Sequence, residues 1–388
     1  MSTTFVHQLV PSVVPGDATT GHTLQVQRLL RDLGYESEIF ALAIHPLLEH
    51  RARLIEELRG PSRRDRFLVY QCSAVSELGD WVVGRRESVA VDYHNITPPE
   101  FFHRFDPGIA LSLHAAQVQV AQLSVRAALG ICDSRFNAAD LRARGFRATP
   151  VAPILLDLRE FDAEPDPATA VALEHARREG SSQWLFVGGI APHKAQHRLV
   201  QALAVYRSVY DPGARLSLVG RAVSPGYDAA LRTLVGALGL DGAVDLPGAV
   251  SHEQLVAYYR AADVFVSLSE HEGFCVPLLE AMHHGVPVVA LGAGAVPETL
   301  GVGGLLLDDP APQHVAAALH RVLADRATRA VLVEAGRARL VHFALARTRA
   351  TMAGVVRRWV AAGGVWPDAA PRDGTDDVAD DALVAVTV

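Results

Sequence analysis

The sequence is almost without lysine. Of its 36 basic side chains only Lys194 is a lysine, and all the others are arginines. Lysine carries a compact, strongly hydrated charge, whereas arginine carries a planar fork of donors. A single lysine kept among arginines indicates a position where a point charge is needed, so Lys194 is the first candidate for a functional side chain.

Cysteine is also scarce, and long apolar runs are absent. Cys72, Cys132 and Cys275 lie far apart with no paired spacing, which is typical of reduced thiols and not of a disulfide framework or a zinc site. The first residues lack a basic segment followed by a long apolar stretch, and no run of roughly 18 apolar residues occurs. We therefore expect a cytoplasmic protein without a transmembrane segment.

The balance of charge is negative. The formal net charge is −7 and the pI is near 6.2, which argues against a nucleic-acid partner, because such proteins present a basic face. With 388 residues, 49% of them hydrophobic and 20% charged, the chain is expected to be globular with two domains of about 150–200 residues each.

Short apolar runs alternate with helical patterns along most of the chain. Strands alternating with helices imply parallel pairing through crossover connections, so we predict an α/β fold of two Rossmann-like, doubly wound parallel-sheet domains facing across a cleft. Ligands bind such sheets at the carboxyl ends of the strands. The predicted strands are 5–10, 38–43, 67–71, 88–93 and 130–132 in the first half, then 184–187, 216–219, 243–246, 264–268, 286–291 and 304–307.

The domain boundaries are predicted from composition. The first domain is expected to cover residues 1–160 and the second 170–344, with the acidic, proline-bearing stretch 158–169 as the linker. A helix at 345–362 is expected to pack back on the first domain. Residues 363–388 are acidic and mixed, and we expect them to be disordered.

The sharpest motif is SEHEGFCVPLLEAMHHGVPVVA at residues 269–290. Glu272 precedes a tight turn, and Pro277 stands where a helix is expected to begin. The free backbone N–H groups and the dipole at such a helix start favour a diphosphate. Glu280 follows Glu272 by eight positions, and two carboxylates can accept hydrogen bonds from vicinal hydroxyls, which suits a sugar at one end and a ribose at the other.

A second motif, LFVGGIAPHKAQ, covers residues 185–196. A predicted strand ends in Gly188 and Gly189, and Lys194 is expected to open the next helix. Glycines let a ligand approach the backbone closely, and the lysine supplies a cation for phosphate oxygens. A glycine-rich loop alone is weak evidence, but the only lysine of the chain lies in this one.

Together these motifs resemble those of the retaining, two-Rossmann (GT-B) glycosyltransferases of family 4, also called group 1 glycosyl transferases. Their hallmark is a glutamate, seven intervening residues and a second glutamate, here Glu272 and Glu280, preceded by a loop like Gly188 to Lys194. The resemblance covers about residues 5–345 by pattern and is motif-specific over 185–310. It implies an acceptor-side first domain, a nucleotide-sugar-binding second domain and a hexosyltransferase without a cofactor.

The resemblance also implies the roles of individual residues. Lys194 would neutralise the diphosphate, Glu272 would contact hydroxyls of the transferred sugar, and His94, in VDYHNITPPEFF, would hydrogen-bond that sugar close to the reacting centre. Glu280 would hold the ribose. Further donor contacts are implied for Gly16, Gly188, Gly189, Val250, Gly273, Phe274, Cys275 and Val276. Asp17, His22 and Asn95 are candidates for acceptor contact, although Asp17 could instead cap a loop.

The chain departs from the family pattern at Gly189, where the family usually has an arginine that helps to hold the diphosphate. Arg221, in LVGR, either reaches the same phosphates from a neighbouring loop or is a solvated loop residue. No D-x-D triplet, the pair of carboxylates that holds a divalent metal in other nucleotide-sugar transferases, occurs in the sequence. We therefore expect no metal, with Lys194 and the helix start stabilising the departing diphosphate.

Several alternatives remain open at this point. The missing arginine raises the possibility of a catalytically degenerate, sugar-nucleotide-binding subunit that supports a partner enzyme. A nicotinamide oxidoreductase is disfavoured, because no G-x-G-x-x-G follows the first strand. A UDP-sugar is favoured as donor, with GDP-mannose next. The acceptor, whether a small sugar or aminocyclitol, a lipid-linked glycan or a natural-product aglycone, and the oligomeric state are not determined.

Overall fold

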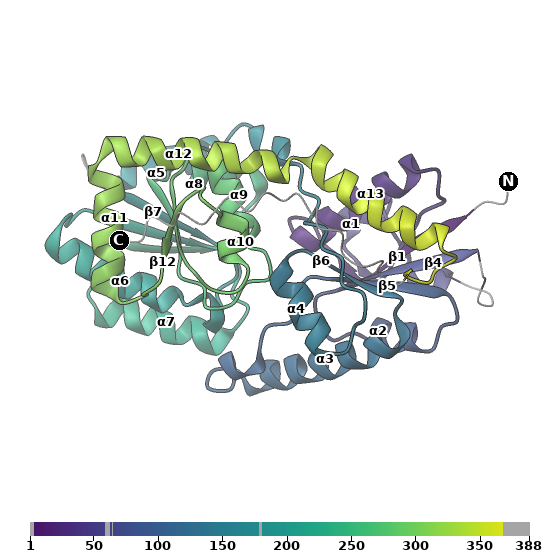
Figure 1. The fold of residues 1–388 in the computed structure, drawn as a ribbon. Coiled ribbons are helices and arrows are strands. Elements are labelled where there is room, and N and C mark those ends of the chain that lie inside the picture. The colour runs from purple at the N-terminus through teal and green to yellow at the C-terminus, as the bar shows by residue number, and fades with distance from the viewer. Residues whose placement is uncertain (1–3, 59–62, 64, 178–180, 368–388) are drawn as a thin grey trace. The chain divides into compact units, whose positions relative to one another are not determined.

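The computed structural model describes residues 4–58, 63, 65–177 and 181–367, which form two compact α/β units (Figure 1). Unit 1 consists of the described residues up to Pro98, Leu111–Asp157 and those from Phe343 onward. Unit 2 consists of Pro99–Ala110 and Leu158–His342. Each unit is built on a six-stranded sheet whose neighbouring strands are all parallel.

Unit 1 has the strand order β3-β2-β1-β4-β5-β6. The strand order reverses between β1 and β4, and this switch point is where ligands bind in doubly wound sheets. The strands are β1 (Phe5–Val13), β2 (Ile39–Ile44), β3 (Arg53–Leu54), β4 (Arg66–Cys72), β5 (Ser88–Tyr93) and β6 (Leu129–Cys132). The helices are α1 (Ala18–Asp32), α2 (Glu77–Val83), α3 (Pro107–Arg126, in this unit from Leu111), α4 (Arg135–Ala143) and α13 (Leu345–Ala361).

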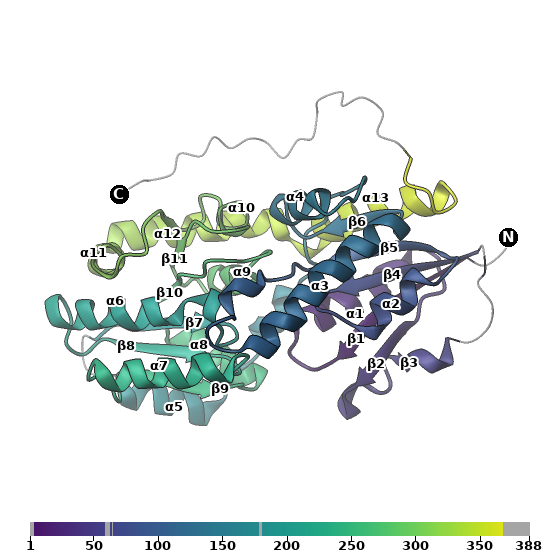
Figure 2. The same ribbon diagram turned by 90° about the horizontal axis from the view of Figure 1, so that it is seen from below.

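Both faces of this sheet are buried, so its strands are apolar at successive positions. Along β4, Leu68 and Tyr70 pack with residues of α2, α3 and α4, and Figure 2 looks onto α2 and α3. Phe67 and Val69 point to the other face, which α1 and α13 cover. Trp359 of α13 is fully buried there, and its indole N–H donates to Ser88 Oγ at 2.9 Å.

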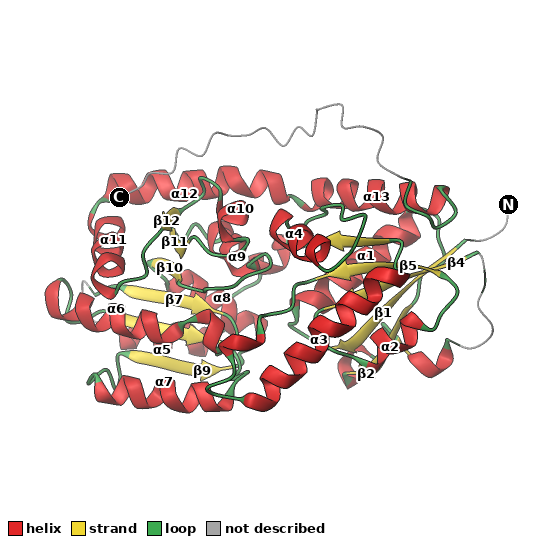
Figure 3. Cartoon of the chain, turned by 60° about the horizontal axis from the view of Figure 1, so that its bottom comes forward, coloured by secondary structure: helices red, strands yellow, loops and turns green. Residues whose placement is uncertain are grey.

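Unit 2 repeats the same order, β12-β11-β10-β7-β8-β9, with its switch point between β7 and β10 (Figure 3). Trp184 and Phe186 of β7 pack with α6, α7 and α11 on one face. On the other face Phe265 stacks on Tyr259 of α8. The strands are β7 (Gln183–Val187), β8 (Arg215–Val219), β9 (Val244–Gly248), β10 (Val264–Ser267), β11 (Val288–Leu291) and β12 (Leu305–Leu307). The helices are α5 (Pro167–Ala176), α6 (Gln196–Val209), α7 (Pro225–Ala237), α8 (His252–Ala261), α9 (Val276–His283), α10 (Val296–Leu300), α11 (Pro312–Ala324) and α12 (Arg326–Leu340).

The predicted fold class, two Rossmann-like doubly wound parallel sheets, is confirmed, but the chain is divided differently from the predicted boundaries. Pro99–Ala110, expected in the first domain, belongs to unit 2, where Phe105 packs edge-on against Tyr227. The expected linker 158–169 is also part of unit 2. Its acidic and proline residues mark a helix start, because Asp166 caps α5 by accepting from Thr169 N at 2.8 Å.

The last helix agrees with the expectation, whereas the residues that follow it differ. The helix α13 belongs to unit 1 and contacts α1. Gly363–Pro367, expected to be disordered, follow α13 in an ordered path, and the carbonyl of Gly364 accepts from the Trp359 indole at 3.2 Å. The rest of the expected disordered tail, 368–388, lies outside the described residues. Within the described ranges, no helix is long and apolar enough to cross a membrane.

Replacing Trp359 with alanine tests the docking of α13. We expect Trp359→Ala to lower the free energy of unfolding of unit 1 by about 3–5 kcal/mol, because a large buried ring leaves a cavity. Val125→Ala on α3 of the same unit is the control: this residue is 91% exposed, and the change should stay within about 0.5 kcal/mol. Urea unfolding measures the free energy of unfolding of both variants. An equally small loss in the two variants would contradict the docking of α13.

Candidate functional site

In unit 2 the candidate residues follow strands that end around the switch point. β7 leads into Gly188 and Gly189, β8 leads into Arg221, and β10 leads into the loop that carries Glu272. Parallel strands present their carboxyl ends at one edge of the sheet, so residues far apart in the sequence meet there.

Lys194 and Glu272 form an ion pair at this edge. Lys194 Nζ lies 2.7 Å from both carboxylate oxygens of Glu272, and the two side chains keep only 21% and 8% of their exposure. Burial works against the ammonium, but the Glu272 carboxylate holds the pKa of Lys194 above its ordinary value. Lys194 therefore stays a cation at neutral pH, and the third of its N–H groups remains for a ligand.

The backbone that carries Lys194 differs slightly from the predicted one. Pro192–Lys194 form a 3₁₀ turn and Ala195 has a left-handed backbone with φ of 51°, so α6 begins at Gln196 and not at Lys194. Gln196 Nε2 donates to the carbonyl of Gly189 at 2.9 Å, which ties the helix start to the glycine loop.

The glycine loop packs against the end of β8. A Cβ at Gly220, where φ is +150°, would lie 2.1 Å from the carbonyl oxygen of Gly188, so this position requires glycine. A Cβ at Gly189 would lie 2.6 Å from Val223 Cγ2, so any side chain there requires Val223 to move. Arg221 is exposed and its carbonyl accepts from Ile190 N at 2.9 Å, which fixes its backbone beside the loop.

The turn before α9 is supported by a loop that sequence analysis missed. Cys275 has φ of 71°, and its buried thiol has a pKa raised well above the ordinary value by desolvation. Gly294, after β11, packs so closely that a Cβ would lie 2.5 Å from the carbonyl oxygen of Glu272, which also accepts from Ala295 N at 2.9 Å. Thr299 Oγ1 donates to the carbonyl of Phe274 at 2.6 Å. The G-A-G-A run at 292–295 was the available signal.

Glu280 lies further along α9 and is 8% exposed. The hydroxyl of Tyr259 donates to its carboxylate at 2.6 Å, and His284 stacks on Tyr259 with ring centres 5.1 Å apart. Burial raises the pKa of Glu280 to about 7. Tyr259 was missed because a tyrosine within a helical pattern is read as core. The remaining predicted donor residues are placed as follows: Gly273 in the loop, Val276 as the first residue of α9, and Val250 half-buried two residues after β9.

In unit 1 a polar network occupies the carboxyl ends of β4, β5 and β6. His94 follows β5, and its Nδ1 lies 2.9 Å from Asp133 Oδ2, beyond the end of β6. Its Nε2 lies 2.6 Å from Gln71 Oε1 of β4. Gln71 and Asp133 were not predicted, because each reads as an isolated polar residue at a strand end.

The protonation of His94 follows from the order of donors in this network. Gln8 Nε2 donates to the carbonyl of Thr23 at 2.9 Å, so its amide oxygen is left to accept from Gln71 Nε2 at 3.1 Å. Gln71 then turns its own oxygen towards His94. Both ring nitrogens of His94 face acceptors, and the ring is therefore a doubly protonated cation. Burial by itself lowers the pKa of His94, but the carboxylates, foremost Asp133, raise it to about 9.

His22, expected to contact an acceptor, is buried inside the same network. Its Nδ1 accepts from Leu155 N at 2.8 Å, so its Nε2 carries the proton shared with Asp92 Oδ2 at 3.0 Å. Among the described residues, His22, Asp92 and His94 are the one group whose spacing could suit a metal. An ion there would have to displace protons that already have partners, so the hydrogen bonding of this group favours protons.

The other unit 1 candidates lie around this network. Asp17 is exposed and caps α1, because its Oδ2 accepts from Thr20 N at 2.8 Å, which is the capping alternative. Gly16, with φ of 72°, turns the chain into that cap. Asn95 has φ of 74° and donates to Asn137 Oδ1 at 2.8 Å.

Comparison with known proteins supports the resemblance. Residues 172–339 match the model of the family described as glycosyl transferases group 1, and these residues lie in unit 2. The chain is 36% identical over 188 residues to a D-inositol 3-phosphate glycosyltransferase of Geodermatophilus obscurus, covering 46% of this chain and 41% of that protein. It is 33% identical over 183 residues to a GDP-mannose-dependent alpha-(1-6)-phosphatidylinositol monomannoside mannosyltransferase of Mycobacterium tuberculosis, covering 45% and 46%. The chain thus spans less than half the length of these curated relatives.

Solved structures establish the fold as GT-B. HepE of Anabaena, in complex with UDP and glucose, superposes with a TM-score of 0.72 at 19% identity, covering 91% of this chain and 99% of that one. Sucrose-phosphate synthase of Thermosynechococcus elongatus gives 0.70 at 21% identity, covering 92% and 100%.

The charge on His94 predicts how the stability of the fold depends on pH. In the folded protein His94 keeps its proton up to about pH 9, whereas in the unfolded chain it releases it near pH 6.5. The stabilisation of the fold by protonated His94 is therefore complete below about pH 6.5 and is lost as the pH rises through about 9. The difference in unfolding free energy between wild type and His94→Gln should fall by up to about 3 kcal/mol over this range. NMR of the His94 ring should show a titration midpoint near pH 9. A midpoint near pH 6.5 would mean that the network does not keep the ring protonated.

Proposed function

We propose that the protein is a retaining, metal-independent hexosyltransferase of family 4 that uses a nucleotide-diphosphate sugar and acts in the cytoplasm. The observation that carries the proposal is the Lys194–Glu272 pair, which joins the glycine loop to the turn before α9 at the carboxyl edge of unit 2. A cation and a carboxylate held in contact suit a ligand with phosphate next to sugar hydroxyls.

The diphosphate is proposed to bind Lys194 and the backbone N–H groups at the start of α9. Charge grows on the diphosphate as the sugar leaves, and fixed donors in a partly buried site stabilise it without reorganisation. Gly189 has no side chain and so provides no cation, and Val223 lies in the space beside it. Arg221, exposed and anchored to Ile190 by its backbone, is the arginine we propose for that role.

The nucleoside is proposed to bind at Glu280. A carboxylate with a pKa of about 7 accepts the hydrogen bonds of ribose hydroxyls more strongly when it is ionised. Tyr259 holds the carboxylate in position and would remain its partner when the ribose binds.

His94 is proposed to act as a charged hydrogen-bond donor and not as a general base. A base needs an unprotonated nitrogen, whereas both nitrogens of His94 face acceptors. A sugar hydroxyl would take the place of Gln71 as the acceptor at Nε2. Asp133 and His22 are then positioning residues for this ring, and Gln71 holds Nε2 until the hydroxyl binds. Asp17 and Asn95 are proposed for the acceptor.

A UDP-sugar remains the preferred donor, with GDP-mannose as the second choice. HepE was solved with UDP, and one curated relative is named as GDP-mannose-dependent. The alternative of a degenerate binding subunit is weakened by the intact Lys194–Glu272 pair and by the buried Glu280.

Donor turnover tests the proposal. The full chain is incubated with UDP-, GDP- and ADP-sugars in excess EDTA, and release of the nucleoside diphosphate is followed with and without candidate acceptors, including inositol phosphate. We expect release with a UDP-sugar or GDP-mannose, and a roughly 10²–10³-fold slower rate for Lys194→Ala. Arg321→Ala, a change at an exposed helix position, is the matched control. Binding of donor without release would favour the degenerate subunit, and loss of activity in EDTA that manganese restores would overturn the metal-free mechanism.

The two glutamates should differ in their kinetic effects. Glu280 holds the ribose equally in ground and transition states, so Glu280→Gln should raise donor KM about ten- to a hundred-fold. Wild-type KM should also rise as pH falls below about 7, where Glu280 takes up a proton, and the variant should lose this dependence.

Glu272 lies where positive charge grows on the departing sugar, so Glu272→Gln should lower kcat by about 10²-fold. Steady-state kinetics with varied donor separate the two effects. If Glu280→Gln abolishes kcat while Glu272→Gln changes only KM, the two ends of the donor are assigned in reverse.

A further inference from the structure

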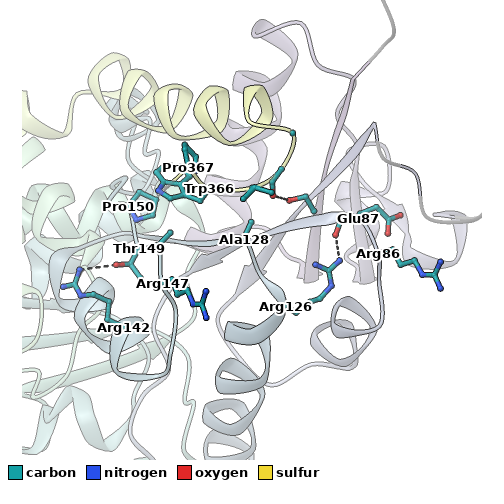
Figure 4. A pocket seen from close by; sticks show the side chains of 15 residues that line it. Arg86, Glu87, Arg126, Ala128, Arg142, Arg147, Thr149, Pro150, Trp366 and Pro367 are labelled. Atoms are coloured by element: carbon teal, nitrogen blue, oxygen red, sulfur yellow. Dashed lines mark hydrogen bonds between the residues drawn. The ribbon is translucent and has the colours of Figure 1, made fainter. Parts of the chain in front are cut away.

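Unit 1 contains a hollow at the opposite edge of its sheet from the His94 network (Figure 4). Its volume is about 1020 Å³, and it opens where β5 and β6 begin, at Ser88 and beside Ala128. The same two strands lead at their other ends to His94 and Asp133. The hollow is therefore separate from the candidate residues of unit 1.

Arginines dominate the lining of this hollow. Four line it, namely Arg86, Arg126, Arg142 and Arg147, and Glu87 is the single acidic residue among the lining side chains. The Glu87 carboxylate is buried and already bound by two further arginines, Arg66 at 2.5 Å and Arg85 at 2.6 Å. It therefore does not balance Arg142 and Arg147, and these two side chains make the hollow positive in a chain whose net charge is −7.

Two of these arginines are available to a ligand. Arg142 donates to the Thr149 hydroxyl at 3.2 Å, and Arg147 is exposed; neither has a carboxylate partner in the part of the chain that the structure describes. Figure 4 shows both on one side of the hollow. Arg126 is fixed differently, because its Nε donates to the carbonyl of Arg85 at 2.8 Å, which holds its guanidinium at the wall.

An aromatic ring completes the lining. Trp366 is half-buried, and the guanidinium of Arg358 lies 4.8 Å from its ring centre. Indole offers a flat apolar surface against which a sugar or another ring can pack. A guanidinium group pairs with phosphate through two parallel hydrogen bonds, and an arginine that is not already paired with a carboxylate is available for this interaction.

We propose that this hollow binds a small phosphate-bearing molecule of sugar size, with its phosphates on Arg142 and Arg147 and its organic part against Trp366. A bisphosphorylated sugar has one phosphate for each of the two arginines and an organic part for Trp366, whereas inorganic phosphate fills little of the hollow and has nothing to pack on the ring. The inference does not depend on the proposed transfer reaction, because no residue of the hollow takes part in it.

Calorimetry on the full chain with fructose 1,6-bisphosphate as the probe tests the proposal, with fructose as the uncharged comparison. We expect a dissociation constant of about 10–100 μM at low salt that weakens as salt is added. The double variant Arg142→Ala/Arg147→Ala should bind at least about tenfold more weakly. The control Arg28→Ala/Arg321→Ala removes the same charge from exposed positions on α1 and α11 and should bind normally.

Two further variants make the outcome decisive. Lys194→Ala should keep the affinity, which separates this hollow from the proposed donor site. Arg147→Glu tests the hollow with a single change at an exposed side chain that has no partner among the described residues, so folding should be preserved. This variant should no longer bind fructose 1,6-bisphosphate.

Equal affinity in the double variant and its control, or no binding at 5 mM probe, overturns the proposal. The chain's own acidic segment is the competing occupant. If the probe binds only after the six aspartates of that segment are changed to asparagine, the segment occupies the hollow and the proposal of a free phosphate ligand is wrong. The six are Asp368, Asp373, Asp376, Asp377, Asp380 and Asp381.

Discussion

The arrangement of parallel strands determines where every candidate side chain lies. In a doubly wound sheet the crossover helices return the chain to the same edge, so each strand delivers its following loop to one side. Lys194 and Glu272 are 78 positions apart and still form a 2.7 Å ion pair, because β7 and β10 are neighbours at the switch point. When the strands of each unit are numbered in chain order, both sheets have the order 3-2-1-4-5-6. The two sites differ in the residues that the loops after these strands place at the edge.

Charge is organised differently at the two carboxyl edges. In unit 2 the cation and the carboxylate pair directly, and Gly294 and Ala295 fix the backbone of Glu272. In unit 1 a main-chain carbonyl, that of Thr23, sets the orientation of two glutamine amides, and these in turn set the proton on His94. A buried histidine thus obtains its charge from hydrogen-bond direction as well as from nearby carboxylates.

The sequence predicts the strands and most helices well, because buried parallel strands are continuous apolar runs and their loops are marked by glycine and proline. It also predicts Lys194, Glu272 and Glu280, which motif spacing and the absence of other lysines single out. It does not predict the supporting residues, since Gln71, Asp133, Tyr259 and Gly294 become partners only through strand order. The prediction that 158–169 is a linker was made because Asp-Pro reads as a break, whereas here it caps α5.

The contact between Gly189 and Val223 constrains how this loop can change over time. A Cβ at position 189 would lie 2.6 Å from Val223 Cγ2. An arginine at 189 and a valine at 223 therefore clash unless the β8–α7 loop relaxes. An arginine at 189 thus requires Val223 or its loop to shift, and a smaller residue at 223 removes this requirement. The two positions are therefore coupled: the effect of a substitution at one depends on the residue at the other, and with valine at 223 a cation is more easily carried by a neighbouring position, such as Arg221.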